Sequence, residues 1–439
     1  MKSKLNLKIS TVLGILAFTQ VHAGNSSLLD VYHAAQKSDP ILKQNIQQHE
    51  STKETLNQAY ATLYPTIGAS ASLSENYTTN ISGNDYDYSK QNIQLQLDQT
   101  VYDARAFLAR DMAELKVKSG EGTLEEAYQN LILRVTNAYF DVLLAEDGYQ
   151  LNQLELKAIS RQLEQAQQRY EVGIIAITEV LTAQAGYDQT LANSLVSENE
   201  VKIANEQLQE ITGDAFNKLA RLREDINLTE PVPNDINHWV NLAQENSPII
   251  ASLTHKLDSM KKNIELQKST SYPSLNLNAN YQYSDVDGPL VSSARAGSDS
   301  SITLKLSVPI YTGGSISSTI RQANNDYLVE AHKLDEKQRS IAKQTRSNFL
   351  GVISSIAQVK ALKQAVISTT SSLDATEAGY SVGTQTIVDV LNIQRDLYAA
   401  KKQLLSAQYN YVKSMISLKY SAGILSEKDL DDSTQLFIN

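Results

Sequence analysis

Two points of the chain combine helix-ending glycines with polar side chains that could do chemistry. Gly173 and Gly383 each follow a long helical pattern, and glycine readily adopts the left-handed conformation that ends a helix. Thr178 and Thr386 are predicted to be the N-cap residues of the helices that follow. Asp389 lies three residues after Thr386, which is the spacing of a capping box. Its carboxylate is therefore either a helix cap or a charge that meets a solute, and the spacing leaves both interpretations open.

No motif for bond-making chemistry accompanies these polar residues. The sequence has no phosphate-binding glycine loop, no His-Glu-x-x-His and no Gly-x-Ser-x-Gly pattern. Its six histidines are scattered without the spacing of metal ligands, and it contains no cysteine. We therefore expect neither enzyme activity nor a cofactor, metal site or disulfide.

The glycines must be positioned by very long helices. Residues 104–171 and 315–381 contain no proline, and a helix of that length measures on the order of 100 Å. Such lengths are typical of coiled coils, although a solid helical bundle is the alternative to a hollow wall. Heptad-like spacing predicts one buried seam in each helix. These seams are Leu131, Val135, Ala138, Val142, Ala145 and Tyr149 in the first helix, and Phe349, Val352, Ile356 and Val359 in the second.

Four segments are predicted to be strands because apolar and polar residues alternate within them. Ile93, Leu95 and Leu97, for example, are separated by polar residues. Alternation over about ten residues is typical of a transmembrane β-barrel strand, although a half-buried soluble sheet has the same period. The polar segments 78–91 and 284–300 are long like the extracellular loops of a barrel. The predicted strands cover residues 66–77, 92–102, 274–283 and 301–311.

Four strands cannot close a barrel, and lipid does not tolerate an open sheet edge. If these strands span a membrane, the chain must oligomerise. Two, three or four copies would give barrels of 8, 12 or 16 strands. The predicted fold class is therefore mixed, with β-barrel strands and long α-helical coiled coil in one chain.

The chain is internally duplicated. Residues 169–213 return 210 positions later as residues 379–423, with the Val-Gly pairs, two leucines and the final glycine aligned. Such a repeat indicates a fold built from two copies of one unit. We predict that the first copy covers residues 24–230 and the second residues 231–439.

The first 23 residues have the pattern of a secretory signal peptide. Lys2, Lys4 and Lys8 precede a short apolar run, and Ala23 is a small residue suited to cleavage. The apolar run is well short of the roughly 20 residues that span a membrane, and no other apolar run approaches that length. Removal of residues 1–23 changes the net charge from −10 to about −13, since three lysines are lost. This acidic balance argues against nucleic acid as a partner.

Three segments carry a resemblance to the TolC family of outer-membrane efflux ducts. They are RQLEQAQQRYEVGIIAITEV (161–180), LDATEAGYSVGTQTIVDVL (373–391) and SVPIYTGGSI (307–316). The resemblance implies a homotrimer with a 12-stranded barrel in outer-membrane lipid and a helical tunnel in the periplasm. Residues 214–245 and 424–439 would form a mixed band around the tunnel. It also implies export of drugs or proteins, in efflux or type I secretion, with a periplasmic adaptor and an inner-membrane pump of the RND or ABC type.

The resemblance further implies a gate at the tips of the tunnel. Tyr380 matches a gate tyrosine that bonds an acidic residue, which is Glu179 here, so Tyr380→Phe is expected to raise conductance. Thr178 matches a gate residue whose usual partner is an arginine. Gln385 stands at that arginine's position, so the charged link is expected to be weaker or absent.

The same resemblance implies a charged constriction and a docking surface. Asp389 matches one of two acidic rings, whereas Asn392 replaces the second, which should weaken cation selectivity and cation block. Gln162 and Glu377 match further polar contacts of the closed tip. The expected adaptor-contact residues are Val172, Gly173, Ile174, Val382, Gly383 and Thr384.

Two other classes of protein share parts of this pattern. A passive outer-membrane porin would use similar strands, but it has no need for helices of this length. A trimeric coiled-coil adhesin would explain export and long helices, but it would not need duplicated strand pairs. Conductance in a bilayer distinguishes a duct from an adhesin, and drug sensitivity distinguishes an efflux duct from a porin.

Overall fold

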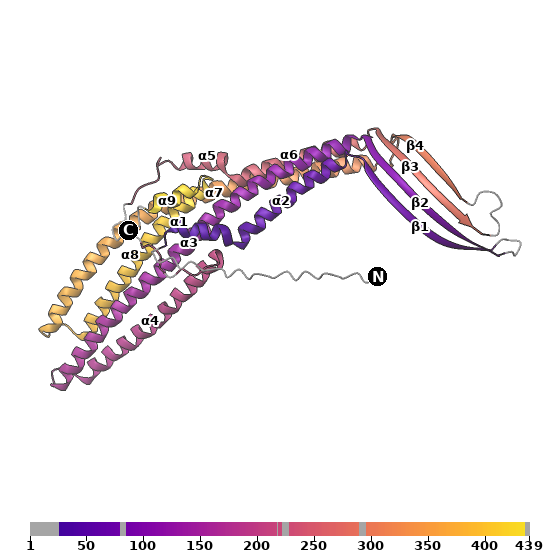
Figure 1. Cartoon of the computed structure of the whole chain (residues 1–439). Coiled ribbons are helices and arrows are strands. Elements are labelled where there is room, and N and C mark those ends of the chain that lie inside the picture. The colour runs from indigo at the N-terminus through magenta and orange to yellow at the C-terminus, as the bar shows by residue number, and fades with distance from the viewer. Residues whose placement is uncertain (1–25, 80–84, 217, 222–227, 289–295, 435–439) are drawn as a thin grey trace, which may run out of the picture.

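The chain is elongated, with a four-stranded sheet at one end and two helical tips at the other (Figure 1). The computed structural model describes residues 26–79, 85–216, 218–221, 228–288 and 296–434. The predicted signal peptide, residues 1–23, lies outside the described residues.

The secondary structure elements follow one order twice, namely two helices, two strands, a long helix and a returning helix. The first set is α1 (Leu28–Ser38), α2 (Pro40–Ala61), β1 (Thr66–Thr79), β2 (Asp85–Tyr102), α3 (Ala104–Glu171) and α4 (Ile177–Thr212). The second set is α5 (Ile236–Asn246), α6 (Pro248–Ser269), β3 (Ser274–Asp287), β4 (Ala296–Ser307), α7 (Ser315–Ser381) and α8 (Ile387–Ser421), followed by α9 (Glu427–Thr434). The fold is therefore internally duplicated, as the sequence repeat predicted.

The sheet is antiparallel, with strand order β1-β2-β3-β4, so β1 and β4 are open edges. Its register places apolar residues together on one face, because Leu95 is opposite Ala69 and Tyr281. The other face is polar, and the Gln94 amide donates a hydrogen bond to Asn280 Oδ1 at 2.8 Å. Two faces of opposite polarity are what a strand between lipid and water requires.

The strands differ in length from the prediction. β1 continues to Thr79 and β2 begins at Asp85, so much of the predicted loop 78–91 is strand, and the predicted loop 284–300 is shortened in the same way. Residues 80–84 and 289–295 lie outside the described residues. The polar residues at the outer ends of these strands were predicted to be loop, because sequence composition does not show which residues pair across strands. At the other end β4 stops at Ser307, because Pro309 has no N–H to continue the ladder.

The long helices begin and end as predicted. α3 has 68 residues and α7 has 67, and the main core lies around the middle of α3, where α1, α4 and α8 pack against it. In the first seam Leu131, Val135, Ala138 and Val142 are buried, whereas Ala145 and Tyr149 are only partly buried. All four residues of the second seam are buried.

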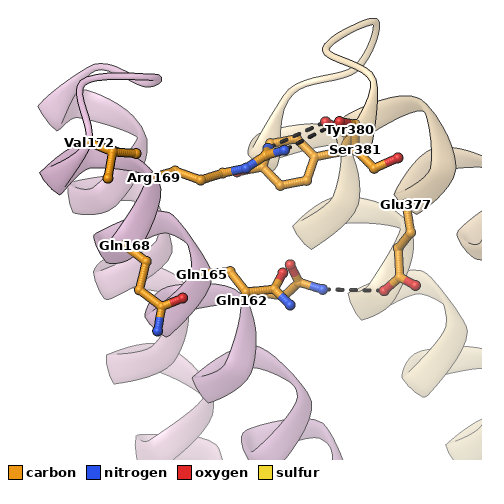
Figure 2. Close-up of a pocket in the computed structure, with 8 residues that line it drawn as sticks. All are labelled: Gln162, Gln165, Gln168, Arg169, Val172, Glu377, Tyr380 and Ser381. Atoms are coloured by element: carbon orange, nitrogen blue, oxygen red, sulfur yellow. Dashed lines mark hydrogen bonds between the residues drawn. The ribbon is translucent and has the colours of Figure 1, made fainter.

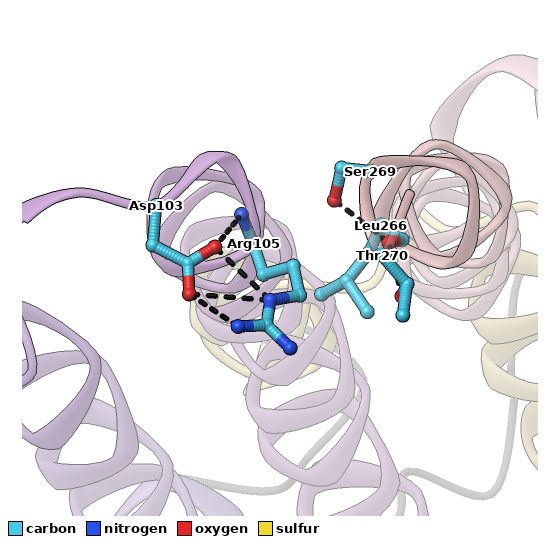
Figure 3. A network of polar contacts seen from close by, with 5 residues as sticks. All are labelled: Asp103, Arg105, Leu266, Ser269 and Thr270. Atoms are coloured by element: carbon cyan, nitrogen blue, oxygen red, sulfur yellow. Dashed lines mark hydrogen bonds and ion pairs between the residues drawn. The ribbon is translucent and has the colours of Figure 1, made fainter. Parts of the chain in front are cut away.

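At the junction between the sheet and the helices, local polar contacts cap the helix ends (Figure 3). Asp103 caps α3 by accepting a hydrogen bond from the Arg105 backbone N–H at 2.9 Å, and its carboxylate also pairs with the Arg105 guanidinium. At the nearby end of α6, the hydroxyls of Ser269 and Thr270 both donate to the carbonyl oxygen of Leu266. These contacts satisfy backbone groups that a helix end leaves free.

One 18-residue window within α7 is long and apolar enough, by composition alone, to cross a membrane. The expectation that no other segment approaches this length was therefore too strong. Only 22% of that window is buried in the single chain. It lies inside a 67-residue helix that packs against α6 and α8, so we assign it to the helical wall.

The predicted band, residues 214–245 and 424–439, contains α9 and all of α5 except its last residue, Asn246, in its described part. Its only isolated β-bridge among the described residues joins Ser26 to Leu219 in parallel. Leu425 and Leu430 are buried against the main core, so this part of the chain packs around the middle of the long helices.

Candidate functional site

The first tip is a tight turn between α3 and α4. Gly173 has a φ angle of 76°, a left-handed backbone conformation that is strained for a residue with a side chain. Its N–H donates to the Tyr170 carbonyl at 2.8 Å, and the Ile174 N–H donates to the Arg169 carbonyl at 2.9 Å. These two bonds form the Schellman motif, which satisfies carbonyls that the end of α3 leaves free.

The second tip repeats this geometry between α7 and α8. Gly383 has a φ angle of 83°, and its N–H donates to the Tyr380 carbonyl at 3.2 Å. The Thr384 N–H donates to the Gly379 carbonyl at 2.9 Å. A Cβ atom on Gly379 would lie 2.7 Å from Cγ of Gln385, so the glycine lets Gln385 fold back onto α7.

The two returning helices are capped differently. Thr386 caps α8 as predicted, because its hydroxyl accepts from the Asp389 N–H and the Asp389 carboxylate accepts from the Thr386 N–H at 2.9 Å. The Thr386 hydroxyl and then the Thr386 N–H lower the pKa of Asp389 below its usual value. The N-cap of α4, however, is Ala176, so the prediction for Thr178 is wrong. The repeat offset of 210 places Ala176 on Thr386, and alanine has no side-chain oxygen to cap with.

A groove of about 620 Å³ separates the ends of α3 and α7 (Figure 2). The Gln162 amide donates a hydrogen bond across it to Glu377 Oε1 at 3.3 Å, so the structure brings these two predicted residues together. The lining residues are Gln162, Gln165, Gln168, Arg169, Val172, Glu377, Tyr380 and Ser381.

Tyr380 is buried beside this groove, with 7% of its surface exposed. It packs in a small apolar cluster with Leu163, Ala166, Ala183, Ile387 and Val390, which we call the tip cluster. Its hydroxyl has no hydrogen-bond partner among the described residues. The hydrogen bond between Tyr380 and Glu179 is therefore not formed within the chain, because the ring points into the tip cluster, while Glu179 lies partly exposed in the first turn of α4.

Arg169 contacts Tyr380 from the neighbouring helix, and sequence reasoning missed it. Its guanidinium carbon lies 4.6 Å from the centroid of the Tyr380 ring. Its two terminal nitrogens donate to the carbonyl oxygens of Tyr380 and Ser381, each at 3.4 Å (Figure 2). A basic residue in the last turn before Gly173 was the available signal, since cations are favoured near helix C-termini.

The remaining predicted gate residues are exposed or separate. No hydrogen bond joins Thr178 to Gln385 within the described part of the chain, so the structure does not bring these two together. Asp389 and Asn392 are both exposed on α8. The Asn392 side-chain oxygen accepts from Arg395 at 3.4 Å, which places a further cation beside the predicted constriction.

The tips themselves expose apolar side chains. Val172, Ile174 and Val382 are 69%, 68% and 74% exposed. Gly173, Gly383 and Thr384 are exposed beside them. Apolar side chains gathered at the ends of two hairpins form a surface that suits another protein.

Comparison with known proteins identifies the class of this chain. The sequence pattern of a family described as outer membrane efflux protein matches residues 31–214 and 239–423, one match in each repeat. The chain belongs to the outer membrane efflux protein family. The match confirms the predicted class of function, an exit duct in the outer membrane whose helical part lies in the periplasm.

Several curated relatives align over nearly the whole chain. Outer membrane protein TolC of Vibrio cholerae serotype O1 is 35% identical over 437 residues, which are 98% of this chain and 98% of the relative. Outer membrane protein TolC of Escherichia coli K12 is 34% identical, covering 92% of this chain and 83% of the relative. Alkaline protease secretion protein AprF of Pseudomonas aeruginosa is 28% identical, covering 92% and 86%.

Solved channels share the fold. The CmeC outer membrane channel of Campylobacter jejuni has a TM-score of 0.78 at 17% identity, covering 99% of this chain and 98% of that one. VceC of Vibrio cholerae has a TM-score of 0.74 at 17% identity, covering 90% and 96%. The predicted fold class, barrel strands joined to a long helical tunnel, is confirmed.

Proposed function

We propose that three copies of this chain form a gated exit duct that works with a periplasmic adaptor and an inner-membrane pump. The observation that carries the proposal is the continuity of one chain from a two-faced sheet to helical tips. α3 alone measures on the order of 100 Å, which suits a wall that crosses the periplasm. The outer-membrane efflux relatives support the same arrangement.

Closure of the barrel supports the trimer. β1 and β4 are open edges, and lipid requires that both be paired, so β4 of one copy would pair with β1 of the next. The helical part also exposes apolar side chains, which are Leu195 and Val196 on α4 and Leu350 and Ile367 on α7. Three copies would bury these side chains and give a barrel of 12 strands. The expected chain organisation is a signal peptide at 1–23, then repeats at 24–230 and 231–439.

The tip residues would form the gate and the docking surface. The Gln162–Glu377 hydrogen bond would help to keep the tip closed, with Tyr380 packed behind it. Thr178, Glu179 and Gln385 would face neighbouring copies, where partners absent from one chain become available. Asp389 and Asn392 would line the constriction, and the exposed apolar tips around Val172 and Val382 would meet the adaptor.

The cargo would be chosen outside the duct. Names of relatives refer to secretion of a protease, to resistance against cobalt, zinc and cadmium, and to solvent efflux. A duct of one design would serve such different cargoes only if the pump and adaptor select them. The duct would then conduct passively once open, and it would catalyse no reaction.

Two measurements test this proposal together. The purified protein should run as a trimer and give discrete, small single-channel currents in a planar bilayer. The same gene should restore drug resistance to a strain that lacks its own outer-membrane efflux duct. Currents without restored resistance would identify a passive porin instead, and an absence of currents would favour an adhesin. Cross-linking in cells followed by purification would then identify the adaptor and pump.

A further inference from the structure

The contact of Arg169 with α7 is a polar link between the α3/α4 and α7/α8 hairpins near their tips. Arg169 lies in the last turn of α3, whereas Tyr380 and Ser381 end α7. Its guanidinium lies over the Tyr380 ring and donates to two backbone carbonyls, as Figure 2 shows. The contact therefore fixes both a side chain and a helix end of the other hairpin.

Three physical effects favour this contact. The face of an aromatic ring attracts a cation, and arginine is the side chain most often found there. The last carbonyls of a helix lack intrahelical partners, so the Ser381 carbonyl is free to accept. The C-terminal end of α7 also carries the negative end of the helix dipole. Because Arg169 is partly buried, water screens this attraction less than at an open surface.

The tip cluster packs apolar residues of both hairpins together, but among the described residues few polar contacts join the hairpins at this level. The groove of about 620 Å³ lies between the ends of α3 and α7, and the Gln162–Glu377 hydrogen bond lies about two turns before Arg169 along α3. The second repeat has no equivalent of this contact. The repeat offset places Gly379 at the position of Arg169 in the second copy, and glycine cannot return the interaction.

We propose that Arg169 is a positioning residue of the gate, which holds Tyr380 and the end of α7 against α3 when the tip is closed. Loss of its guanidinium leaves the tip cluster alone to hold the two hairpins together near their ends, so the α7/α8 hairpin moves away from the α3/α4 hairpin more readily. The inference rests on the proposed function, because a gate presupposes a duct. It differs from the gate contacts expected from the sequence, because here the guanidinium of one chain holds the end of α7 in that same chain.

The test is single-channel recording of the full-length trimer in planar bilayers. We expect Arg169→Gln to raise the ratio of open to closed time about tenfold, which corresponds to about 1.4 kcal/mol. Arg169→Lys keeps a charge over the ring but loses the planar fork, so it should restore part of the closed population. Arg161→Gln removes the same charge from an exposed site two turns earlier on α3, and it should leave gating unchanged.

Two further readouts separate gating from folding and from the duct itself. Trimer stability to heat should be equal in Arg169→Gln and the parent protein, since a merely structural role would lower it. Gln162→Leu breaks the other polar link and should also raise the open ratio. If Gln162→Leu opens the channel and Arg169→Gln does not, the inference is wrong while the duct stands. If the parent protein gives no currents, the proposed function fails and the inference fails with it.

Discussion

The Tyr380 ring lies beneath the guanidinium of Arg169, at 4.6 Å, while its own hydroxyl is buried without a partner among the described residues. The two ends of the side chain therefore contribute differently to the closed tip. The ring gains from the cation and from the tip cluster. The hydroxyl is removed from water and forms no hydrogen bond with the part of the chain that the structure describes, and such a loss typically costs about 1–3 kcal/mol.

This division revises the expected effect of Tyr380→Phe. Because the hydroxyl has no partner among the described residues, we now expect Tyr380→Phe to leave both the single-channel conductance and the open population close to those of the parent protein. Tyr380→Leu removes the ring, and it should raise the open population about as much as Arg169→Gln does. Recording both variants side by side distinguishes ring from hydroxyl. A large increase with Tyr380→Phe would mean that a neighbouring copy supplies a partner for the hydroxyl.

The long elements were predictable because one signal dominates each of them. Helices 104–171 and 315–381 could be bounded from the sequence, since a lack of proline and a closing glycine decide a helix without tertiary contacts. The strands were located correctly, but they were predicted to end too early at their outer ends, because those ends are rich in polar residues. Only the pairing of Thr79 with Asp85 shows that the hairpin continues so far.

The contacts at the tips were harder to predict, because they depend on distances between separate helices. The residues next to Arg169 in the sequence do not indicate that its side chain reaches the carbonyl oxygens of Tyr380 and Ser381 on another helix. The misplaced cap at Thr178 had a different cause. A threonine beside the turn was preferred over Ala176, although the repeat register already aligned Ala176 with Thr386.

A second carboxylate near the proposed constriction should strengthen cation block. Asn392→Asp adds one charge per copy beside Asp389, and like charges in a narrow aperture concentrate multivalent cations. We expect a trivalent cation to block this variant at about tenfold lower concentration than the parent protein, or about 1.4 kcal/mol in binding.

The matched control for this block is Asn410→Asp, which adds the same charge about 27 Å further along α8. Arg395→Gln is a useful companion, since it removes a cation from the same turn as Asn392. Equal block in Asn392→Asp and Asn410→Asp would place the constriction elsewhere.

The capping box should set the pH at which Asp389 loses its charge. Hydrogen bonds from the Thr386 hydroxyl and N–H lower its pKa below the usual 3.8. A lowered folded pKa means that the stabilising contact is present above pH 3.8 and is lost as pH falls through the lower value. Thr386→Val removes the hydroxyl, so the midpoint for loss of trivalent-cation block should move to higher pH. Titration of block in both proteins measures this shift, and equal midpoints would show that the cap does not hold the carboxylate.

The contact between Asp39 and Arg134 should contribute strongly to stability. Asp39 is buried at 1% exposure, caps α2 through the Leu42 N–H at 2.7 Å, and pairs with both terminal nitrogens of Arg134 at 3.0 and 2.7 Å. Burial would raise the pKa of Asp39, but the bonds from Arg134 and Leu42 outweigh it and the pKa is lowered. Its contribution is therefore present above about pH 3.8 and disappears as pH falls through the lower folded pKa.

Asp39→Asn leaves Arg134 partly buried without its counter-charge. Breaking a buried pair costs about 3–5 kcal/mol, and the partial exposure of Arg134 reduces the expected loss to about 2–3 kcal/mol. Urea unfolding followed by circular dichroism in detergent would measure it. The control is Asp335→Asn on α7, whose partner Arg339 is highly exposed, so its loss should stay below about 1 kcal/mol. Equal losses in the two variants would contradict the argument, because burial is what makes the removal of one partner costly.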